Sequence, residues 1–335
     1  MAVRVDNLGW LLARAEETVM AGGAIGFDDA LALTEVPDDS VGELTRLADR
    51  VRRRFAREKV DLCSITSARS GICAEDCRFC TQSSHYRTSA PIYPMKPASE
   101  IVVAAGKAED DGAHRFCIVT SGDSLSDRDF ETVLEAVGGI RDETGLKRCA
   151  SVGWLTPERA AALKDAGLDR YHHNIETARS FFPKVCSTHT YDDKLATINH
   201  LKEAGIETCV GGILNLGETP RQRIEFMFEL KALEPDSVPV NFLIPRAGTP
   251  LGDRRPMAAL EAVKYLAILR LVLPRAYIRL AGGRLETFGD KPVMPFSAGV
   301  NALLIGNLLT TGGPDAKSDI TLLKCLGFDV EADGE

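Results

Sequence analysis

The chain has 335 residues, of which 44% are hydrophobic and 26% are charged, and its formal net charge is −8. This apolar content suffices for a large buried core, and the acidic balance argues against nucleic acid as the main partner. No stretch is apolar enough over the roughly 18 residues of a membrane span, and the N-terminus lacks the pattern of a signal peptide. We therefore expect a cytoplasmic protein with no membrane partner. Nine cysteines in such a chain point to metal or redox chemistry rather than to disulfides.

Residues 1–57 are predicted to form a helical extension that leads into the main domain. Ser40 and Glu43 have the spacing of a capping box, in which both side chains accept hydrogen bonds from backbone N–H groups at the start of a helix. The apolar residues after this box recur at helical spacing. They are Leu44, Leu47, Val51 and Phe55.

Strand-like and helix-like segments alternate from Val60 onward, which is the pattern of βα units around a parallel sheet. Eight such units predict a TIM-type (β/α)8 barrel over residues 58–328, and the acidic residues 329–335 are predicted to form a disordered tail. The eight candidate strands are Val60–Ser67, Arg115–Ser121, Lys147–Gly153, Arg170–Thr177, Glu207–Leu216, Ser237–Pro245, Tyr277–Gly283 and Ala302–Gly306.

The ends of several intervening helices can be recognised from single residues. Thr156 precedes Pro157, which is typical of an N-cap followed by the first helical position, and Thr219 opens a second capping box. Gly167 and Gly205 are predicted to end helices.

Three cysteines follow the first predicted strand directly. Cys73, Cys77 and Cys80 have a C-x3-C-x2-C spacing, and three thiolates on so short a loop can hold three corners of a cubane iron–sulfur cluster. The fourth iron would then be open to another ligand. A structural zinc site completed by His85 is an alternative, and buried unliganded thiols are another. The spacing, with Phe79 before the last cysteine, resembles the signature of radical S-adenosylmethionine (SAM) enzymes, in which the open iron binds SAM.

The fourth predicted strand carries an unusual polar face. Side chains alternate between the two faces of a strand, so His172, Asn174 and Glu176 share one face. This face predicts a polar barrel interior that could hold a ligand.

A second set of cysteines lies within predicted strands, together with an arginine in the seventh. An isolated cysteine in a strand is usually part of the core, and a buried arginine is costly unless it is paired or coordinated. The members of this set are Cys117, Cys149, Cys209 and Arg279. The remaining cysteines, Cys63, Cys186 and Cys325, are predicted to be structural.

The sequence resembles the biotin synthase family of radical SAM enzymes from about Gly26 to about Phe328. The segments that carry the resemblance are Gly71–Tyr86, Tyr171–Thr177, Cys209–Ile213, Leu216–Thr219, Ser237–Asn241 and Ile278–Arg284. The cysteine loop is shared by all radical SAM enzymes, whereas the combination of three strand cysteines with a strand arginine is typical of a much narrower group of them.

The resemblance implies a sulfurtransferase that inserts sulfur into dethiobiotin to form biotin. It implies a [4Fe–4S] cluster that cleaves SAM, on Cys73, Cys77 and Cys80. It also implies an auxiliary cluster that donates sulfur, a [2Fe–2S] or another iron–sulfur type, on Cys117, Cys149, Cys209 and Arg279. The implied SAM contacts are Phe79, Ser121, Gly122, Asn174 and Glu176. The implied substrate contacts are His172, Asn174 and Asn241. An external electron donor such as flavodoxin or ferredoxin and a homodimer are implied as well.

Three positions depart from the family pattern. His172 stands where asparagine is expected, Glu176 where aspartate is expected, and Leu285 where an acidic residue is common. One alternative is therefore a related radical SAM barrel that acts on an amino-acid-like substrate or matures a metallocofactor. Another is a non-catalytic iron–sulfur electron carrier or a zinc-stabilised binding protein.

Overall fold

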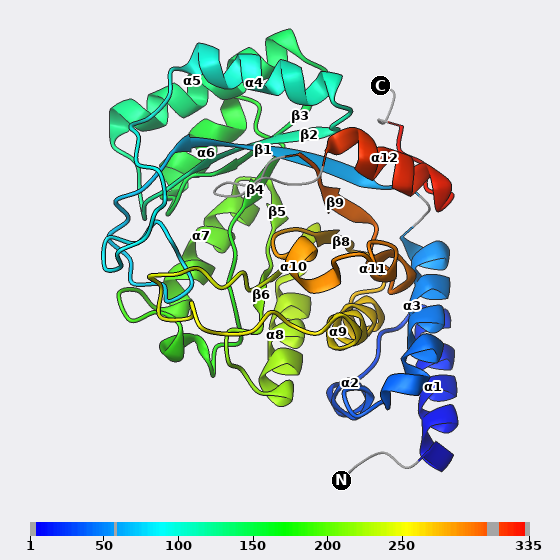
Figure 1. Ribbon diagram of the computed structural model, residues 1–335. Helices are drawn as coiled ribbons and strands as arrows, with labels where there is room; N and C mark the ends of the chain where they lie inside the picture. The colour runs from blue at the N-terminus through cyan, green and yellow to red at the C-terminus, as the bar shows by residue number, and fades with distance from the viewer. Residues whose placement is uncertain (1–4, 57–58, 307–314, 332–335) are drawn as a thin grey trace.

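The strands form one closed parallel barrel (Figure 1). The computed structural model describes residues 5–56, 59–306 and 315–331. Its strand segments are β1 (Asp61–Arg69), β2 (Arg115–Thr120), β3 (Lys147–Ser151), β4 (Arg170–His172), β5 (Glu207–Cys209), β6 (Gly212–Leu214), β7 (Ser237–Phe242), β8 (Tyr277–Leu280) and β9 (Ala302–Leu304). They pair in the order β5-β4-β3-β2-β1-β9-β8-β7-β6, and a pairing of Cys209 with Ser237 closes the ring. The predicted barrel is confirmed.

Helices alternate with the strands and surround the barrel (Figure 1). They are α4 (Ala98–Asp110), α5 (Asp127–Glu143), α6 (Pro157–Asp165), η2 (Phe182–Lys184), α7 (Tyr191–Glu203), α8 (Pro220–Leu233), α9 (Ala259–Val272), α10 (Arg284–Phe288), α11 (Met294–Ser297) and α12 (Ala316–Cys325). None of the described helices is long and apolar enough to cross a membrane.

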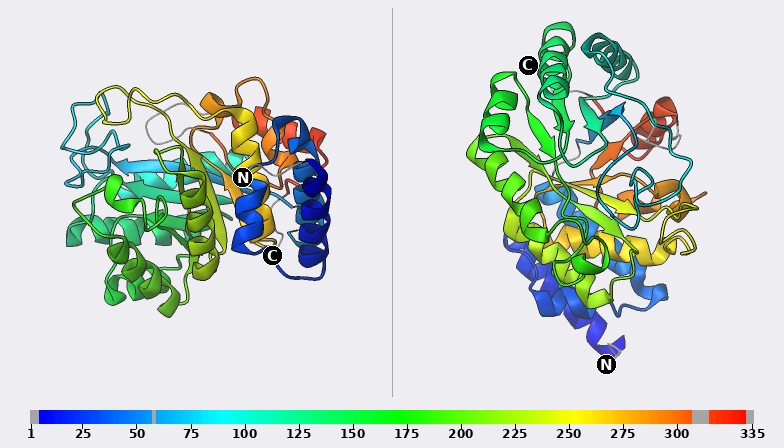
Figure 2. Two further views of the ribbon diagram at one scale, coloured as in Figure 1. Left: turned by 90° about the horizontal axis from the view of Figure 1, so that it is seen from below. Right: turned by 90° about the vertical axis from the view of Figure 1, so that its left-hand side faces the viewer.

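The segment before the barrel is helical, as predicted. It contains α1 (Val5–Met20), α2 (Phe27–Leu33), η1 (Asp38–Ser40) and α3 (Val41–Phe55). Helix α3 packs against α9, so the extension covers one side of the barrel (Figure 2). The domain boundary at residue 57 and the disordered tail remain predictions, because residues 57–58 and 332–335 lie outside the described residues.

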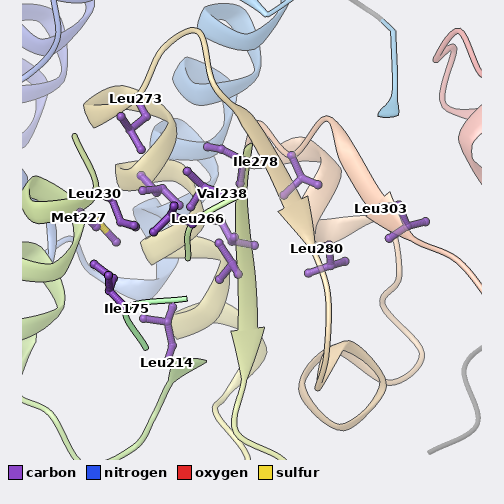
Figure 3. Close-up of a cluster of buried hydrophobic side chains, with 14 of the residues drawn as sticks. Ile175, Leu214, Met227, Leu230, Val238, Leu266, Leu273, Ile278, Leu280 and Leu303 are labelled. Carbon is purple, nitrogen blue, oxygen red and sulfur yellow. The ribbon is translucent and has the colours of Figure 1, made fainter. Parts of the chain in front are cut away.

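The main apolar core lies between the strands and the outer helices. Val238 on β7 and Ile278 on β8 are buried and lie with Leu230 of α8 and Leu266 of α9 in the same apolar cluster (Figure 3). Side chains alternate along a strand, so the residue after Ile278 points the other way. That residue is Arg279, which lines the barrel interior.

The fourth strand is shorter than predicted. Strand β4 ends at His172, although the chain continues beside the fifth strand, where the Ile175 amide donates to the Gly211 carbonyl at 3.0 Å. The side chain of Asn174 takes the place of a backbone hydrogen-bond acceptor of the sheet, because its Oδ1 accepts a hydrogen bond from the Gly211 amide at 3.1 Å. Beyond His172 the pairing is limited to an isolated parallel bridge between Glu176 and Gly212, where Glu176 adopts a φ of 67°. The predicted shared face is nevertheless retained, since His172, Asn174 and Glu176 all line the interior.

The fifth strand is divided into β5 and β6, so the single strand predicted there is wrong. Two glycines at the division allow three segments to approach closely. A Cβ on Gly211 would lie 2.0 Å from the Pro239 carbonyl oxygen, and one on Gly212 would lie 2.2 Å from that of Glu176. No other residue type fits at such distances.

The predicted helix N-caps are partly confirmed. Thr156 and Thr219 each accept a hydrogen bond from the amide three residues later, at 3.3 Å. The capping box at Ser40 and Glu43 is wrong, because the Ser40 hydroxyl donates to Asp39 at 3.0 Å and makes no cap hydrogen bond. Ser40 ends the turn η1 with φ −102° and ψ −3°, whereas a side-chain N-cap needs an extended backbone.

Candidate active site at the mouth and in the interior of the barrel

The loops after β1 and β7 lie at the same end of the barrel (Figure 2). They touch where a Cβ on Gly248 would lie only 2.0 Å from the Arg87 carbonyl oxygen. The carboxyl ends of parallel strands meet at this end, which is where barrel enzymes place their active sites.

The loop with the three clustered cysteines folds back on itself. The Cys73 amide donates to the Gln82 carbonyl at 2.9 Å, and the Gln82 side chain accepts from the Gly71 amide at 3.1 Å. Gly71 and Ile72 have φ values of 83° and 51°, so the chain turns sharply just before the first cysteine. The thiols are half-buried, and burial together with the neighbouring Cys73 raises the pKa of the Cys80 thiol.

The residues after β2 pack against the base of this loop. The Ser121 amide donates to the Arg69 carbonyl at 3.0 Å, and its hydroxyl donates to the Gly71 carbonyl at 2.8 Å. Gly122 has a φ of 103°, and a Cβ there would lie 2.3 Å from the Arg69 guanidinium. Ser121 and Gly122, two expected SAM contacts, therefore lie beside the cysteine loop but do not line the interior cavity described next.

A cavity of about 290 Å³ extends into the barrel interior. It brings together the remaining residues expected to contact SAM or substrate. These are Phe79, His172, Asn174, Glu176 and Asn241. The cavity therefore joins the cysteine loop, which contributes Phe79, to the polar face of the fourth strand.

Two polar residues of this cavity differ in how much hydrogen-bonding capacity remains. Asn241 is largely committed, because its Nδ2 donates to the Gly212 carbonyl at 3.1 Å and its Oδ1 accepts from the Gly282 amide at 2.9 Å. Among the described residues the Glu176 carboxylate accepts one hydrogen bond, a long one from Asn174 Nδ2 at 3.5 Å, and burial raises the pKa of its carboxyl group. Glu176 is thus the better placed of the two to accept hydrogen bonds from a ligand.

The strand cysteines line the wall of the same cavity. Cys117, Cys149 and Cys209 are each at most 5% exposed, and Cys117 pairs directly with Cys149 across β2 and β3. Burial alone would raise the pKa of Cys149, but a hydrogen bond with Cys117 and the charge of Arg115 lower it to about 7. Despite its burial, Cys209 also has a lowered pKa, because of His172 and Arg279, whereas the hydrogen bond with Cys149 and burial raise the pKa of Cys117. The thiolate, which is the form that binds metal, is therefore favoured at Cys149 and Cys209.

Charged residues from five strands meet at the amino end of the barrel. Oδ2 of Asp61 accepts from Arg170 at 2.9 Å and from Arg279 at 2.8 Å, and Glu207 lies 2.7 Å from Arg170. Burial would lower the pKa of Arg279, but the charge of Asp61 raises it. Nε and Nη1 of the buried Arg115 have no hydrogen-bond partner among the described residues. Such groups normally have an acceptor, and Arg115 lines the cavity with the strand cysteines.

Two residues for which the sequence predicted no functional role lie beside the cysteine loop. The sulfur of Cys186 lies 3.8 Å from that of Cys77 and 3.2 Å from Nδ1 of His189, and these three ligand atoms all lie within 4.8 Å of one another. The Asp76 carboxylate accepts from the Ser187 amide at 2.8 Å, which docks the two loops together. The C-x2-H spacing of Cys186 and His189 was the only sequence signal, and it lies 109 residues from Cys77.

The alternative zinc set is not assembled around His85. Nε2 of His85 lies 2.9 Å from the Ala74 carbonyl oxygen and is hydrogen-bonded to it. Within the described part of the chain, the side chains at this loop whose ligand atoms lie close enough together to hold a metal ion are Cys77, Cys186 and His189 instead.

Comparison with known proteins identifies the family. Residues 68–230 match the model of the radical SAM superfamily, and residues 239–329 match that of the biotin and thiamin synthesis associated domain. A biotin synthase of Desulforudis audaxviator is 47% identical over 325 residues, which cover 97% of this chain and 98% of the relative. This chain belongs to the biotin synthase family. A second biotin synthase, of Pelotomaculum thermopropionicum, is 46% identical over 312 residues, covering 93% and 97% of the two chains.

A solved structure supports the fold of this biotin synthase family member. The crystal structure of a methylornithine synthase superposes with a TM-score of 0.82 at 20% identity and covers 96% of this chain and 97% of its own. As a radical SAM enzyme, the chain uses a [4Fe–4S] cluster and SAM. The family assignment decides against the zinc-stabilised binding protein and the non-catalytic electron carrier.

Proposed function

We propose that this enzyme is a sulfurtransferase that inserts sulfur into dethiobiotin and thereby forms biotin. The observation that carries the proposal is the shared cavity. The three strand cysteines line it together with His172, Asn174 and Asn241, the residues expected to contact substrate. Full-length relatives named biotin synthase support the same reaction.

The cysteine loop is proposed to hold the [4Fe–4S] cluster through Cys73, Cys77 and Cys80. Three protein thiolates leave one iron for SAM. When bound, this cluster and SAM supply the carbon radical that an unactivated C–H bond requires, and the auxiliary cluster supplies sulfur. Phe79 of this loop lines the cavity, where it is proposed to help exclude water from the reacting groups.

The strand cysteines are proposed to hold the auxiliary cluster, a [2Fe–2S] or another iron–sulfur type. The donor set fits such a group, because Cys117, Cys149 and Cys209 are buried beside guanidinium groups that favour anions. Nε and Nη1 of Arg115, which have no hydrogen-bond partner in the described part of the chain, offer donors to an anionic ligand at this wall. Arg279, the fourth ligand implied by the family resemblance, lines the same cavity.

The remaining polar residues are proposed to position SAM and substrate. The Glu176 carboxylate would accept hydrogen bonds from the hydroxyl groups of SAM, and the Asn174 amide would donate to them. Ser121 and Gly122 would lie near the amino acid end of SAM. His172 lines the cavity together with Cys209. We propose that this departure from asparagine lies where the substrate would meet the sulfur donor. A flavodoxin or ferredoxin as electron donor and a homodimer remain predictions.

Anaerobic turnover tests the proposal. The iron-loaded protein is incubated with SAM, a strong reductant and dethiobiotin, and mass spectrometry measures biotin and 5′-deoxyadenosine. We expect both products from the unaltered chain. Cys77→Ala should abolish both, because SAM cleavage requires the first cluster. Cys149→Ala should abolish biotin but retain 5′-deoxyadenosine.

Cys325→Ala is the matched control, because Cys325 is exposed on α12 and should leave both products unchanged. Formation of 5′-deoxyadenosine without biotin by the unaltered chain would contradict dethiobiotin as the substrate. It would favour the related barrel enzymes that act on amino-acid-like substrates. Unchanged biotin formation by Cys149→Ala would contradict the role of the strand cysteines.

A further inference from the structure

A second cavity, of about 170 Å³, lies at the amino end of the barrel, opposite the mouth. We call it the amino-end cavity, and we call this end the floor of the barrel. Six strands begin in its wall, and their first residues are Asp61, Arg115, Lys147, Arg170, Glu207 and Tyr277. Lys147 and Glu207 are exposed, so the cavity is open to water at the floor.

The wall of the amino-end cavity carries more positive than negative charge. The carboxylates of Asp61 and Glu207 are already engaged, because they lie 2.9 and 2.7 Å from guanidinium nitrogens of Arg170. The cationic side chains in the wall are Lys59, Arg115, Lys147 and Arg170. The excess of positive charge favours an anion, and a cavity of this volume admits one of only a few atoms.

Arg115 has hydrogen-bonding capacity left to hold such an anion. Its side chain is 3% exposed, and its Nε and Nη1 have no hydrogen-bond partner among the described residues. Its ion pairs are long, 4.0 Å from Nε to Asp61 and 3.5 Å from Nη2 to Glu207, and both exceed normal hydrogen-bond distances. Buried polar groups normally have a partner, so this guanidinium points to an anionic ligand.

The amino-end cavity lies one layer below the strand cysteines. Inward-facing positions recur every second residue along a strand, so Arg115 lies beneath Cys117 on β2, and Lys147 lies beneath Cys149 on β3. Two residues of a strand span about 7 Å. Arg115 and Arg170 line both cavities, which therefore share a wall of buried side chains.

The chemistry proposed above requires a source of sulfide. A cluster that donates sulfur has to receive sulfide again before it can act a second time. SAM and dethiobiotin are proposed to occupy the cavity at the mouth, so the floor offers a separate route to the strand cysteines. Hydrosulfide is a monovalent anion with one heavy atom, which fits the charge and the size of the amino-end cavity. It has the oxidation level of a bridging sulfide, so its incorporation transfers no electrons and releases one proton to water at the floor.

We propose that the amino-end cavity binds hydrosulfide and delivers it to the auxiliary cluster from the floor of the barrel. The inference rests on the proposed function, since it presupposes a sulfur-donating cluster at the strand cysteines. Arg115 holds the anion with its free N–H donors, and Lys147 at the rim attracts it from solution. Attraction of this kind raises the local concentration of an anion and weakens as salt is added.

The first test locates an anion without measuring activity. Crystals of the iron-loaded protein are grown without oxygen and soaked in sodium bromide, and anomalous diffraction locates the bound bromide. We expect bromide beside Arg115, and we expect hydrosulfide added at a lower concentration to displace it. Bromide that hydrosulfide does not displace would be an adventitious ion only and would overturn the inference, as would a cavity without bromide.

The second test measures delivery. After one turnover the protein receives ferrous iron and 35S-labelled hydrosulfide for a set time, the excess is removed, and 35S is counted in the biotin of the next turnover. Label in the other cluster does not contribute, because the sulfur of biotin is proposed to come from the auxiliary cluster. Lys147→Glu should take up label about tenfold more slowly at low hydrosulfide concentration, and Glu207→Gln should take it up faster. Sodium chloride should slow uptake by the unaltered protein.

Lys317→Glu is the matched control, because it makes the same change in net charge at an exposed position of α12 and should leave uptake unchanged. Lys147→Gln, which removes the charge without reversing it, replaces Lys147→Glu if that variant does not fold.

Uptake by Lys147→Glu at the same rate as by Lys317→Glu would overturn the inference. So would an unaltered protein that forms biotin in its first turnover but never incorporates label. Both results leave the proposed function intact. An unaltered protein that forms no biotin even in the first turnover would instead contradict the proposed function itself, and this inference with it.

Discussion

Arg284 and Asp319 form an ion pair that is almost completely buried between α10 and α12. Their side chains are 8% and 4% exposed, and Nη1 of Arg284 donates to Oδ1 of Asp319 at 2.9 Å. The two helices belong to the last two βα units, so the pair ties the end of the chain to the barrel. Loss of one partner would leave the other charged and buried, which is costly.

Asp319→Ala should therefore lower the free energy of unfolding by about 3 kcal/mol. Urea denaturation monitored by circular dichroism measures the change. Asp142→Ala is the control, because Asp142 pairs with Arg141 on the surface, where both side chains are about half-exposed or more and such pairs contribute little. Equal losses for the two variants would show that burial does not determine the contribution of these pairs.

At the scale of single elements, the N-terminal ends of α3 and α8 show under which condition the sequence of a capping box forms its hydrogen bonds. Thr219 has an extended backbone, with φ −76° and ψ 162°, and forms the reciprocal hydrogen bonds of a capping box with Gln222. Ser40 has the right sequence spacing but a helical backbone inherited from η1, so its hydroxyl turns to Asp39. The backbone entering the helix decides whether the same motif forms.

Thr219→Ala should lower the free energy of unfolding by about 1 kcal/mol, the usual cost of a lost N-cap. Ser40→Ala should change it by less than about 0.5 kcal/mol, because no cap hydrogen bond is lost. Thermal or urea unfolding of both variants compares the two ends directly. A loss at Ser40 as large as that at Thr219 would mean that the serine does cap α3 in solution.

At the scale of the whole molecule, Asp61 links strands that are distant in the sequence. Its carboxylate accepts hydrogen bonds from Arg170 of β4 and Arg279 of β8, which are 109 and 218 residues away. Glu207 is the other carboxylate of this group, but its side chain is 47% exposed. The charges of the barrel floor therefore depend mainly on Asp61.

Asp61→Asn should destabilise the barrel by about 3 kcal/mol or more, because two buried guanidinium groups lose their main counter-charge. Glu207→Gln should cost clearly less, since water solvates that end of the network. Urea denaturation of the two variants provides the comparison. A larger effect at Glu207 would contradict the assignment of Asp61 as the central charge.

Much of this protein follows from contiguous stretches of sequence. The alternation of strands and helices, the caps at Thr156 and Thr219, and the spacing of Cys73, Cys77 and Cys80 all depend on residues that are neighbours in the chain. Such patterns act through local backbone geometry and side-chain periodicity, so the barrel and the cysteine loop could be predicted. The resemblance to the biotin synthase family adds the reaction and the expected ligands.

Only the tertiary structure decided which distant residues meet. Cys186 and His189 reach Cys77, Cys63 joins the strand cysteines, and Asp61 pairs with Arg279. These contacts depend on strand register and loop docking across the closed barrel. A shift of one residue in register would turn each side chain to the other face. The pattern of a single strand predicts which residues share a face, but it does not say which residue of a distant strand lies opposite each of them.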